Sequence, residues 1–224
     1  MAWGAPSPLI AVVGMTSEAR IVAAEGVRVI IGGGDTAALE QRLGQAIDAH
    51  LAGDERPSVI SLGVCGALSP ALKPGDLVIG AGVICAGQRF PTDAAWAERL
   101  AADLPFAVKG DVAGGDAVLA SAADKAALFA ATGALVVDME SHAAARLAQR
   151  HALPFAVLRA VSDTADHSLP PAALAGFRQD GGIDLAAVLG SLARQPGQIG
   201  ALLRTARQAG PAFSALKAAR RTLS

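Results

Sequence analysis

The stretch VRVIIGGGDTAALEQRLGQAIDAHLAGDERPSVISL, residues 27–62, contains the pattern that decides the fold class. Two β-branched runs, at 27–31 and 59–62, predict buried strands. Between them, residues 36–52 place leucine or isoleucine at every fourth position (Leu39, Leu43, Ile47 and Leu51). This spacing predicts a helix with one apolar face. Strand, helix and strand in succession are typical of an α/β fold.

The same alternation extends over most of the chain. Further apolar runs predict strands at 9–14, 77–84, 135–137 and 155–161, and an alanine-rich amphipathic pattern predicts a helix at 141–151. Several strands are apolar on both faces, as expected of strands buried in the middle of a sheet. We therefore predict a single α/β domain over residues 1–184, with a central mixed, largely parallel twisted sheet flanked by helices.

Composition excludes several classes of protein. Of the 224 residues, 52% are hydrophobic and 17% are charged, which excludes a disordered chain and a coiled coil. The two cysteines, Cys65 and Cys85, are too few for a disulfide scaffold and lack the spacing of metal ligands, so we expect a reduced, cytoplasmic protein without a metal site. No run approaches the ~20 apolar residues of a membrane-spanning helix.

The C-terminal 40 residues differ from the rest in charge. Residues 185–224 contain no acidic residue, which leaves residues 1–184 at −7. Their six basic residues are Arg194, Arg204, Arg207, Lys217, Arg220 and Arg221. The tail is predicted to form three short amphipathic helices, separated at Pro196 and at Gly210-Pro211. It either packs on the domain or contacts an anionic membrane surface at its inner face. Nucleic-acid binding is disfavoured because the body repels phosphates.

The glycine-rich turn at 32–37, Gly-Gly-Gly-Asp-Thr-Ala, matches the form of a dinucleotide-binding fingerprint. Such a site requires an acidic residue at the end of the next strand, whereas Asp54 and Glu55 precede that strand. Two interpretations remain open. The turn either starts a helix capped by Asp35 or Thr36, or forms a loop that faces an anion or a substrate.

Three further motifs lie near strand ends, where the loops of an α/β sheet converge on one crevice. They are Gly-Val-Cys-Gly-Ala-Leu at 63–68, Asp-Met-Glu-Ser at 138–141 and Arg-Ala-Val-Ser-Asp at 159–163. Their order resembles that of the purine nucleoside phosphorylase superfamily, particularly its methylthioadenosine and S-adenosylhomocysteine nucleosidase branch. This resemblance extends from about residue 9 to residue 166.

The resemblance implies a role for each matching residue. Asp163 protonates purine N7, Glu140 holds the ribose hydroxyls, and Met139 packs on the sugar. Glu18 and Arg159 position the nucleophile. Gly66, Ser162 and Val118 are the other implied substrate-binding residues, and Val118 replaces an aromatic residue that stacks on the base in the family. The resemblance also implies a homo-oligomer, most simply a dimer.

These roles agree with the chemistry of N-glycosidic cleavage. The departing purine needs a proton, so a general acid such as Asp163 has to hold one near neutral pH, through burial or through a neighbouring Asp166 or Glu140. A carboxylate such as Glu140 stabilises the developing oxocarbenium cation. The reaction requires no metal.

The acceptor is phosphate or water. Family phosphorylases bind phosphate through an arginine and a serine at the positions of Ser61 and Val64. Phosphate binding would therefore depend on replacements: the Ser61 hydroxyl, Arg20 or Arg159, and the amides of Gly14, Gly33 and Gly34. Inorganic phosphate is the one co-substrate considered, and no other cofactor is expected.

The whole chain, including residues 169–174 and the tail, resembles the hopanoid-associated phosphorylases of bacteria. This resemblance implies release of adenine from adenosylhopane, and the short segment between Glu18 and Gly32 would leave the 5′ side of the sugar open. One alternative is a soluble methylthioadenosine or S-adenosylhomocysteine nucleosidase. The others are a non-catalytic module that binds adenosine derivatives and a peripheral membrane adaptor with an inert core.

Overall fold

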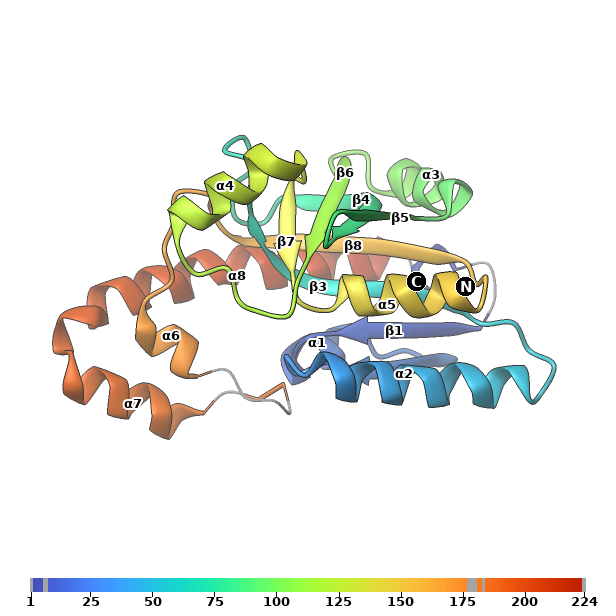
Figure 1. Ribbon diagram of the computed structural model, residues 1–224, viewed down its shortest axis with the longest axis horizontal. Coiled ribbons are helices and arrows are strands. Elements are labelled where there is room, and N and C mark those ends of the chain that lie inside the picture. The colour runs from blue at the N-terminus through green and yellow to red at the C-terminus, as the bar shows by residue number, and fades with distance from the viewer. Residues whose placement is uncertain (1, 6–7, 177–180, 183, 223–224) are drawn as a thin grey trace.

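The computed structural model describes residues 2–5, 8–176, 181–182 and 184–222, which form a single α/β domain as predicted (Figure 1). The strands are β1 (Leu9–Val13), β2 (Val27–Ile31), β3 (Ser58–Ala67), β4 (Leu77–Cys85), β5 (Gln88–Pro91), β6 (Val108–Gly114), β7 (Val136–Asp138) and β8 (Phe155–Asp163). The helices are α1 (Thr16–Val22), α2 (Thr36–Leu51), α3 (Ala94–Asp103), α4 (Ala122–Thr132), α5 (Ser141–Arg150), α6 (Pro171–Ala175), α7 (Leu185–Arg194) and α8 (Ile199–Thr222), with 3-10 turns η1 (Ala2–Gly4) and η2 (Pro196–Gln198).

The strands form one mixed sheet. Strands β2, β1, β3 and β8 are parallel neighbours in that order. Beyond them β4 pairs antiparallel with β8 and parallel with β6, which in turn pairs parallel with β7. Because β7 returns to pair antiparallel with the end of β3, strands β3, β8, β4, β6 and β7 close into a ring. The ends of β3, β7 and β8 therefore meet.

Helices cover both faces of this sheet (Figure 1). On one face, apolar side chains of α2 and α5, such as Leu43 and Leu147, pack against strand residues such as Val59. On the other face, Trp96 of α3 and Ala219 of α8 pack with residues of β1, β3 and β8. Three of the four residues in the predicted apolar spacing of α2, Leu39, Leu43 and Ile47, face the first of these clusters. The fourth, Leu51 at the end of the helix, is 37% exposed.

Strand β3 is longer than the sequence indicates. It continues through the 63–67 part of the Gly-Val-Cys-Gly-Ala motif, which we expected to follow the strand, because these residues keep their parallel pairing with β8. The register shifts between Cys65 and Gly66. Strands β5 and β6 and helices α3 and α4 were not expected. The sequence of β6, VKGDVAG, mixes glycine and charge with its apolar residues and gives a weak strand pattern.

The C-terminal tail forms two helices where we predicted three. A break occurs near Pro196, but α8 runs without interruption from residue 199 to 222 with Pro211 inside it. An internal proline costs a helix roughly 3 kcal/mol. Burial offsets this cost, because Ala212 and Leu216 pack against Ala160 of β8. The Gly210-Pro211 break was therefore a wrong prediction.

The two halves of the tail have different surroundings. The second half of α8 is packed on the domain, as one of our two interpretations required. Helix α7 and the first half of α8 project beside α6 at one end of the molecule (Figure 1), and residues 223 and 224 lie outside the described part. Of the helices that the structure describes, none is long and apolar enough to cross a bilayer.

We expect Leu216→Ala to lower the free energy of unfolding by about 2–5 kcal/mol, because it leaves a cavity between α8 and β8. Urea titration followed by circular dichroism measures this change. Leu203→Ala, on the same helix at a side chain that is 52% exposed, is the matched control and should change stability by less than about 0.5 kcal/mol. Equal losses for the two variants would show that α8 is not part of the core.

Candidate active site

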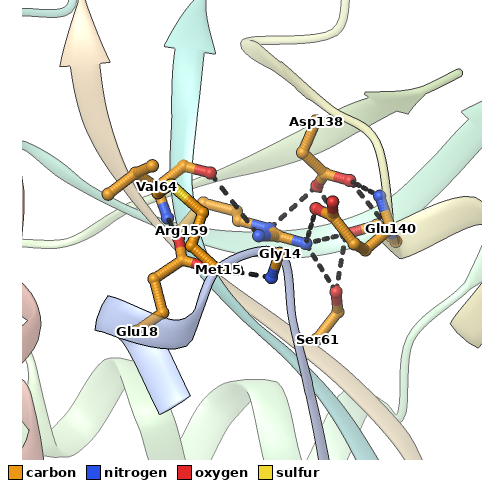
Figure 2. Close-up of polar contacts among 9 residues, drawn as sticks. Gly14, Met15, Glu18, Ser61, Val64, Asp138, Glu140 and Arg159 are labelled. Atoms are coloured by element: carbon orange, nitrogen blue, oxygen red, sulfur yellow. Dashed lines mark hydrogen bonds and ion pairs between the residues drawn. The ribbon is translucent and has the colours of Figure 1, made fainter. Parts of the chain in front are cut away.

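Arg159 of β8 lies at the centre of a buried polar cluster (Figure 2). Its Nε is 2.8 Å from Oδ2 of Asp138, and its NH2 group donates to the hydroxyls of Ser61, at 2.6 Å, and Ser141, at 3.1 Å. The same NH2 lies 3.7 Å from Oε2 of Glu140. The guanidinium is fully buried, so these partners replace the water it loses.

Asp138, at the end of β7, connects Arg159 to the start of α5. Its Oδ1 accepts hydrogen bonds from the backbone N–H groups of Glu140 and Ser141, at 2.9 and 2.7 Å. Its Oδ2 accepts one from the Ser141 hydroxyl, at 2.5 Å. The carboxylate thus satisfies free amides at the N-terminus of α5 and fixes the position of Glu140.

Glu18 of α1 lies on the opposite side of Arg159 (Figure 2). Its Oε2 accepts from the backbone N–H groups of Gly14 and Met15, at 2.8 and 2.7 Å, and its Oε1 accepts from that of Val64, at 2.6 Å. Because Val64 belongs to β3, the Glu18 carboxylate joins the end of β1 to the middle of β3.

Two glycines make room for these carboxylates. A Cβ at Gly63 would lie 2.5 Å from Oε1 of Glu18 and 2.7 Å from NH1 of Arg159. A Cβ at Gly32 would lie 2.7 Å from Cγ of Glu140. Close packing of Glu140 therefore explains the glycine at 32, and Asp35 caps α2 by accepting from the N–H of Ala38 at 3.0 Å. Gly33 and Gly34 line a cavity, so the turn both starts the helix and faces that cavity.

Three carboxylates surround the single guanidinium, so the cluster carries an excess of negative charge when all of them are ionised. Burial raises the pKa of Glu18 even though Arg159 and three backbone donors lower it. Burial also raises the pKa of Glu140 to about 8, with Arg159 opposing the shift and Asp138 and Glu18 adding to it. Such a cluster favours a cation placed beside it.

A cavity opens next to this cluster. Its lining includes these sequence-predicted residues: Gly14, Glu18, Gly33, Gly34, Gly66, Val118, Met139, Glu140, Ser162 and Asp163. Apolar side chains such as Val64, Leu119, Val137 and Leu169 complete much of the remaining wall. The structure therefore brings together most of the residues chosen from separate motifs. It places Asp163 in the same cavity as the carboxylates of Glu18 and Glu140.

Three predicted residues are not in this lining. Arg159 and Ser61 are fully buried behind it, in contact with each other. Arg20 is exposed on α1 and does not line the cavity. Two of the three amides proposed for phosphate are also engaged: that of Gly14 donates to Glu18, and that of Gly33 donates to the carbonyl of Gly14 at 3.0 Å.

Asp163 contacts a cation rather than the carboxylates that we expected beside it. Nζ of Lys125, on α4, forms a buried ion pair with Oδ2 of Asp163. The other oxygen, Oδ1, accepts a hydrogen bond from the Ser162 hydroxyl at 2.6 Å. Asp166 is exposed. The motif match located Asp163 but gave no indication of Lys125, which sits in an alanine-rich segment that resembles an ordinary surface helix.

A second contact that the sequence did not reveal holds the loop carrying Val118. Oδ1 of Asp116 accepts from the Thr36 hydroxyl, at 2.7 Å, and lies 2.8 Å from Nε2 of the buried His142. These contacts tie the loop to the starts of α2 and α5. Among the described residues, no group of three or more His, Cys, Asp or Glu side chains could hold a metal ion.

Comparison with known protein families agrees with this geometry. A family model described as the phosphorylase superfamily matches residues 11–194. The chain belongs to this superfamily. The matched range contains Glu18, Glu140, Arg159 and Asp163, and it ends with the last residue of α7.

Solved structures with the same fold include superfamily nucleosidases. A Helicobacter pylori methylthioadenosine nucleosidase variant with 5′-methylthioadenosine in its active site is 17% identical, with a TM-score of 0.61 and coverage of 95% of this chain and 97% of that chain. Futalosine hydrolase of the same organism is 19% identical, with a TM-score of 0.59 and coverage of 84% and 97%. An S-adenosylhomocysteine nucleosidase from Streptococcus pyogenes is 18% identical, with a TM-score of 0.60 and coverage of 95% and 98%.

In this phosphorylase-superfamily member, Glu140 should make stability depend on pH. Its pKa is about 8 in the folded protein and about 4.5 in the unfolded chain, so between these values only the folded state keeps the proton. The contribution of Glu140 to the free energy of unfolding therefore falls as pH rises from about 5 to 8. Glu140→Gln removes this dependence. We therefore expect the free energy of unfolding of the variant, minus that of wild type, to increase by about 1–3 kcal/mol as pH rises from about 5 to 8.

Urea titrations at several pH values measure this difference. Glu25→Gln, at an exposed glutamate, is the control and should run parallel to wild type. If the difference between Glu140→Gln and wild type stays constant with pH, Glu140 does not hold a proton in the folded protein.

Proposed function

We propose that the protein hydrolyses the N-ribosyl bond of a 5′-substituted adenosine and releases adenine. The observation that carries this proposal is the arrangement of one cavity. It has an acid, Asp163, in one part of its wall and the carboxylates of Glu18 and Glu140, held around Arg159, in another. A purine nucleoside needs these two kinds of group at its two ends during cleavage.

At the base end, cleavage leaves negative charge on the purine. Asp163 delivers a proton to N7 as the bond between C1′ and N9 breaks, and the base departs neutral. The surrounding wall is apolar, with Val118, Leu119, Val137 and Leu169, which suits a flat heterocycle. Without an aromatic partner at Val118, aliphatic contacts supply the packing on the base.

At the sugar end, the reaction develops an oxocarbenium-like cation. Glu140 accepts hydrogen bonds from the ribose hydroxyls, and the carboxylates of Asp138 and Glu18, which outnumber the one guanidinium of Arg159, stabilise the cation. The stabilisation grows as charge develops, so it lowers the barrier rather than only strengthening substrate binding.

Water fits this site better than phosphate as the acceptor. A phosphate dianion would have to enter beside three carboxylates. Most of the donors proposed for it are already used, because the amides of Gly14 and Gly33 donate within the protein and Arg159 pairs with Asp138. A water molecule needs one base to take its proton, and the raised pKa of Glu18 is suitable for that role.

The substrates named for the similar structures support an adenosine derivative. The Helicobacter pylori methylthioadenosine nucleosidase variant holds 5′-methylthioadenosine. A non-catalytic adenosine-binding module is the competing proposal, and it predicts binding without base release. The homodimer and the cytoplasmic location implied by the sequence stay predictions, and light scattering of the purified protein tests the first of them.

The function is tested by incubating the protein with 5′-methylthioadenosine or another short 5′-substituted adenosine, with and without phosphate. We expect free adenine, a hydrolysed sugar product by mass spectrometry, and the same rate in both buffers. A phosphorylated sugar would identify phosphate as the acceptor. Binding without adenine release from any adenosine derivative would favour the non-catalytic module.

Asp163→Asn should reduce adenine release by about 10²- to 10⁴-fold, because asparagine cannot donate a proton to N7. Asp166→Asn is the matched control, since it makes the same chemical change at an exposed residue of the same segment, and it should keep the wild-type rate. Near wild-type adenine release by Asp163→Asn would remove Asp163 from the reaction.

We further propose that the natural 5′ substituent is a lipid, as in adenosylhopane, and that the enzyme meets it at a membrane surface. Four large apolar side chains of α7 and the first half of α8 are exposed, and we call them the arm patch: Leu185, Leu189, Ile199 and Leu203. They belong to helices that project from the domain (Figure 1). Leu169, Gly181 and Gly182, which precede α7 in the chain, line the cavity.

The charges around the arm patch favour an anionic bilayer. Arg194, Arg204 and Arg207 are exposed on the same two helices, and no acidic residue occurs from residue 185 to the C-terminus. Each basic residue near an anionic membrane contributes up to about 1 kcal/mol of attraction, and shallow insertion of leucine side chains adds to this. The expected binding is reversible and sensitive to salt.

Sedimentation with vesicles tests this surface. The double variant Leu189→Glu, Leu203→Glu should lose binding to phosphatidylglycerol vesicles while keeping the wild-type rate on a soluble adenosine. Phe106→Glu changes a 96% exposed aromatic residue in the segment that joins α3 to β6, and should keep both properties. These two elements lie at the other end of the molecule from α7 (Figure 1). Wild-type vesicle binding by the double variant, or no binding by wild type, would refute the membrane role of the arm patch.

A further inference from the structure

Lys125 is buried although lysine is seldom found in protein interiors. It lies on α4 behind Asp163, with 1% of its side chain exposed, and it does not line the cavity. Its Nζ forms the ion pair with Oδ2 of Asp163 and donates to the backbone carbonyls of Thr164, at 3.0 Å, and His167, at 2.9 Å. The ammonium is thus held by three acceptors.

The three acceptors match the three protons of an ammonium group. If the proton shared with Asp163 moves to the carboxylate, the remaining two N–H bonds still reach the carbonyls of Thr164 and His167. The lone pair of the neutral amine then faces the protonated carboxyl group and accepts its hydrogen bond. Both protonation states of Lys125 are therefore satisfied in this buried position without any movement of the backbone.

The Ser162 hydroxyl, at the other oxygen of Asp163, can also form a hydrogen bond in both protonation states of the carboxyl group. Its hydroxyl oxygen lies 2.6 Å from Oδ1 of Asp163 and 3.0 Å from the carbonyl oxygen of Cys65, but it has one proton for these two acceptors. It donates to Asp163 when the carboxylate is ionised. It keeps donating to Oδ1 when the carboxyl proton lies on Oδ2, and it can turn to the Cys65 carbonyl and accept a hydrogen bond if that proton lies on Oδ1 instead.

From this geometry we propose that Lys125 supplies, through Asp163, the proton that departs with the base. The proposal rests on the proposed function. In the empty site Lys125 is an ammonium and Asp163 a carboxylate. The proton moves from Nζ to Oδ2 of Asp163. The new O–H then turns from Nζ towards N7 and delivers the proton as the bond between C1′ and N9 breaks, leaving a neutral amine and a carboxylate.

The protons balance over one catalytic cycle. The attacking water gives its oxygen to C1′ and its proton to Glu18, while the bond electrons leave with the base and are neutralised by the proton from Lys125. Return of a proton from solvent to Lys125 and loss of one from Glu18 restore the starting state. Lys125 is then a positioning residue that acts through Asp163 and does not touch the substrate.

Other titratable groups near the pair do not take over this role. Cys65 of β3 faces Asp163, but burial raises the pKa of its thiol well above the usual range, so the thiol keeps its proton. His167 follows β8, and its pKa is lowered mainly by burial, so it is neutral near pH 7. Asp166 is exposed and Arg204 of α8 faces His167. Lys125 is the group in direct contact with the Asp163 carboxylate.

Two substitutions separate proton supply from simple charge pairing. Lys125→Met removes both the charge and the proton, whereas Lys125→Arg keeps the charge but cannot release a proton, because a guanidinium is not deprotonated in proteins. With a short soluble adenosine at pH 7.5, we expect both variants to lose about 10²-fold in kcat with little change in KM. Lys109→Met, at an exposed ion pair, is the control and should match wild type.

The pH profile gives a readout that a structural role would not change. In Lys125→Met, Asp163 has to take its proton from solvent. The ratio of the variant's kcat to the wild-type kcat should therefore rise at least tenfold as the pH falls from 7.5 to 5. In Lys125→Arg the guanidinium still holds the carboxylate ionised, so this recovery should be much smaller. A wild-type kcat for Lys125→Arg, or no recovery for Lys125→Met at low pH, would overturn proton supply by Lys125.

Lys125→Met alone leaves the buried carboxylate of Asp163 without its ion-pair partner. Making the same substitution in the Asp163→Asn variant avoids this, because asparagine is uncharged. If Lys125 acts through Asp163, adding Lys125→Met to Asp163→Asn should change the residual kcat by less than about twofold. Equal losses in both backgrounds would show that Lys125 is only structural. If Lys125→Met does not fold alone, Lys125→Arg replaces it in the cycle. These outcomes require wild-type adenine release, whose absence would instead refute the proposed function.

Discussion

The site depends on one buried guanidinium. Arg159 has no contact with bulk water, and its burial is tolerated because Asp138, Glu140 and two hydroxyls take the place of solvent. The register between β3 and β8 places it opposite Gly63, the residue at which a side chain would collide with it. Its partners come from β3, the end of β7 and the start of α5, so these segments and β8 have to be placed correctly together.

The same constraint creates a chemical difference between the two ends of the cavity. Around Arg159, carboxylates outnumber cations, and the raised pKa values of Glu18 and Glu140 reflect that excess together with their burial. Around Asp163, one carboxylate faces one ammonium. The first end suits a developing sugar cation and disfavours a phosphate dianion, whereas the second suits the transfer of a proton to a departing base.

Helix α8 shows how one element can serve two purposes along its length. Its second half stabilises the domain by burying Ala212, Leu216 and Ala219 against the strands, and this burial compensates for Pro211. Its first half is not needed for that packing and leaves Ile199 and Leu203 exposed beside basic residues. The whole tail lacks acidic residues in the sequence, but its two halves differ in the structure. The second half of α8 packs on the domain, whereas the first half exposes apolar and basic side chains.

The fold class, most of the strands and the main residues of the cavity could be predicted from the sequence alone. Strand and helix periodicity is local, and the motifs around Glu140, Arg159 and Asp163 mark strand ends, which an α/β sheet brings together. Features that depend on contacts between distant residues became visible only in the folded structure. It placed Lys125 against Asp163, left Arg20 in solvent, used the Gly14 and Gly33 amides internally, and buried Leu216 so that Pro211 did not end the helix. Burial and competition for hydrogen-bond partners arise between segments far apart in the chain, so no local pattern records them.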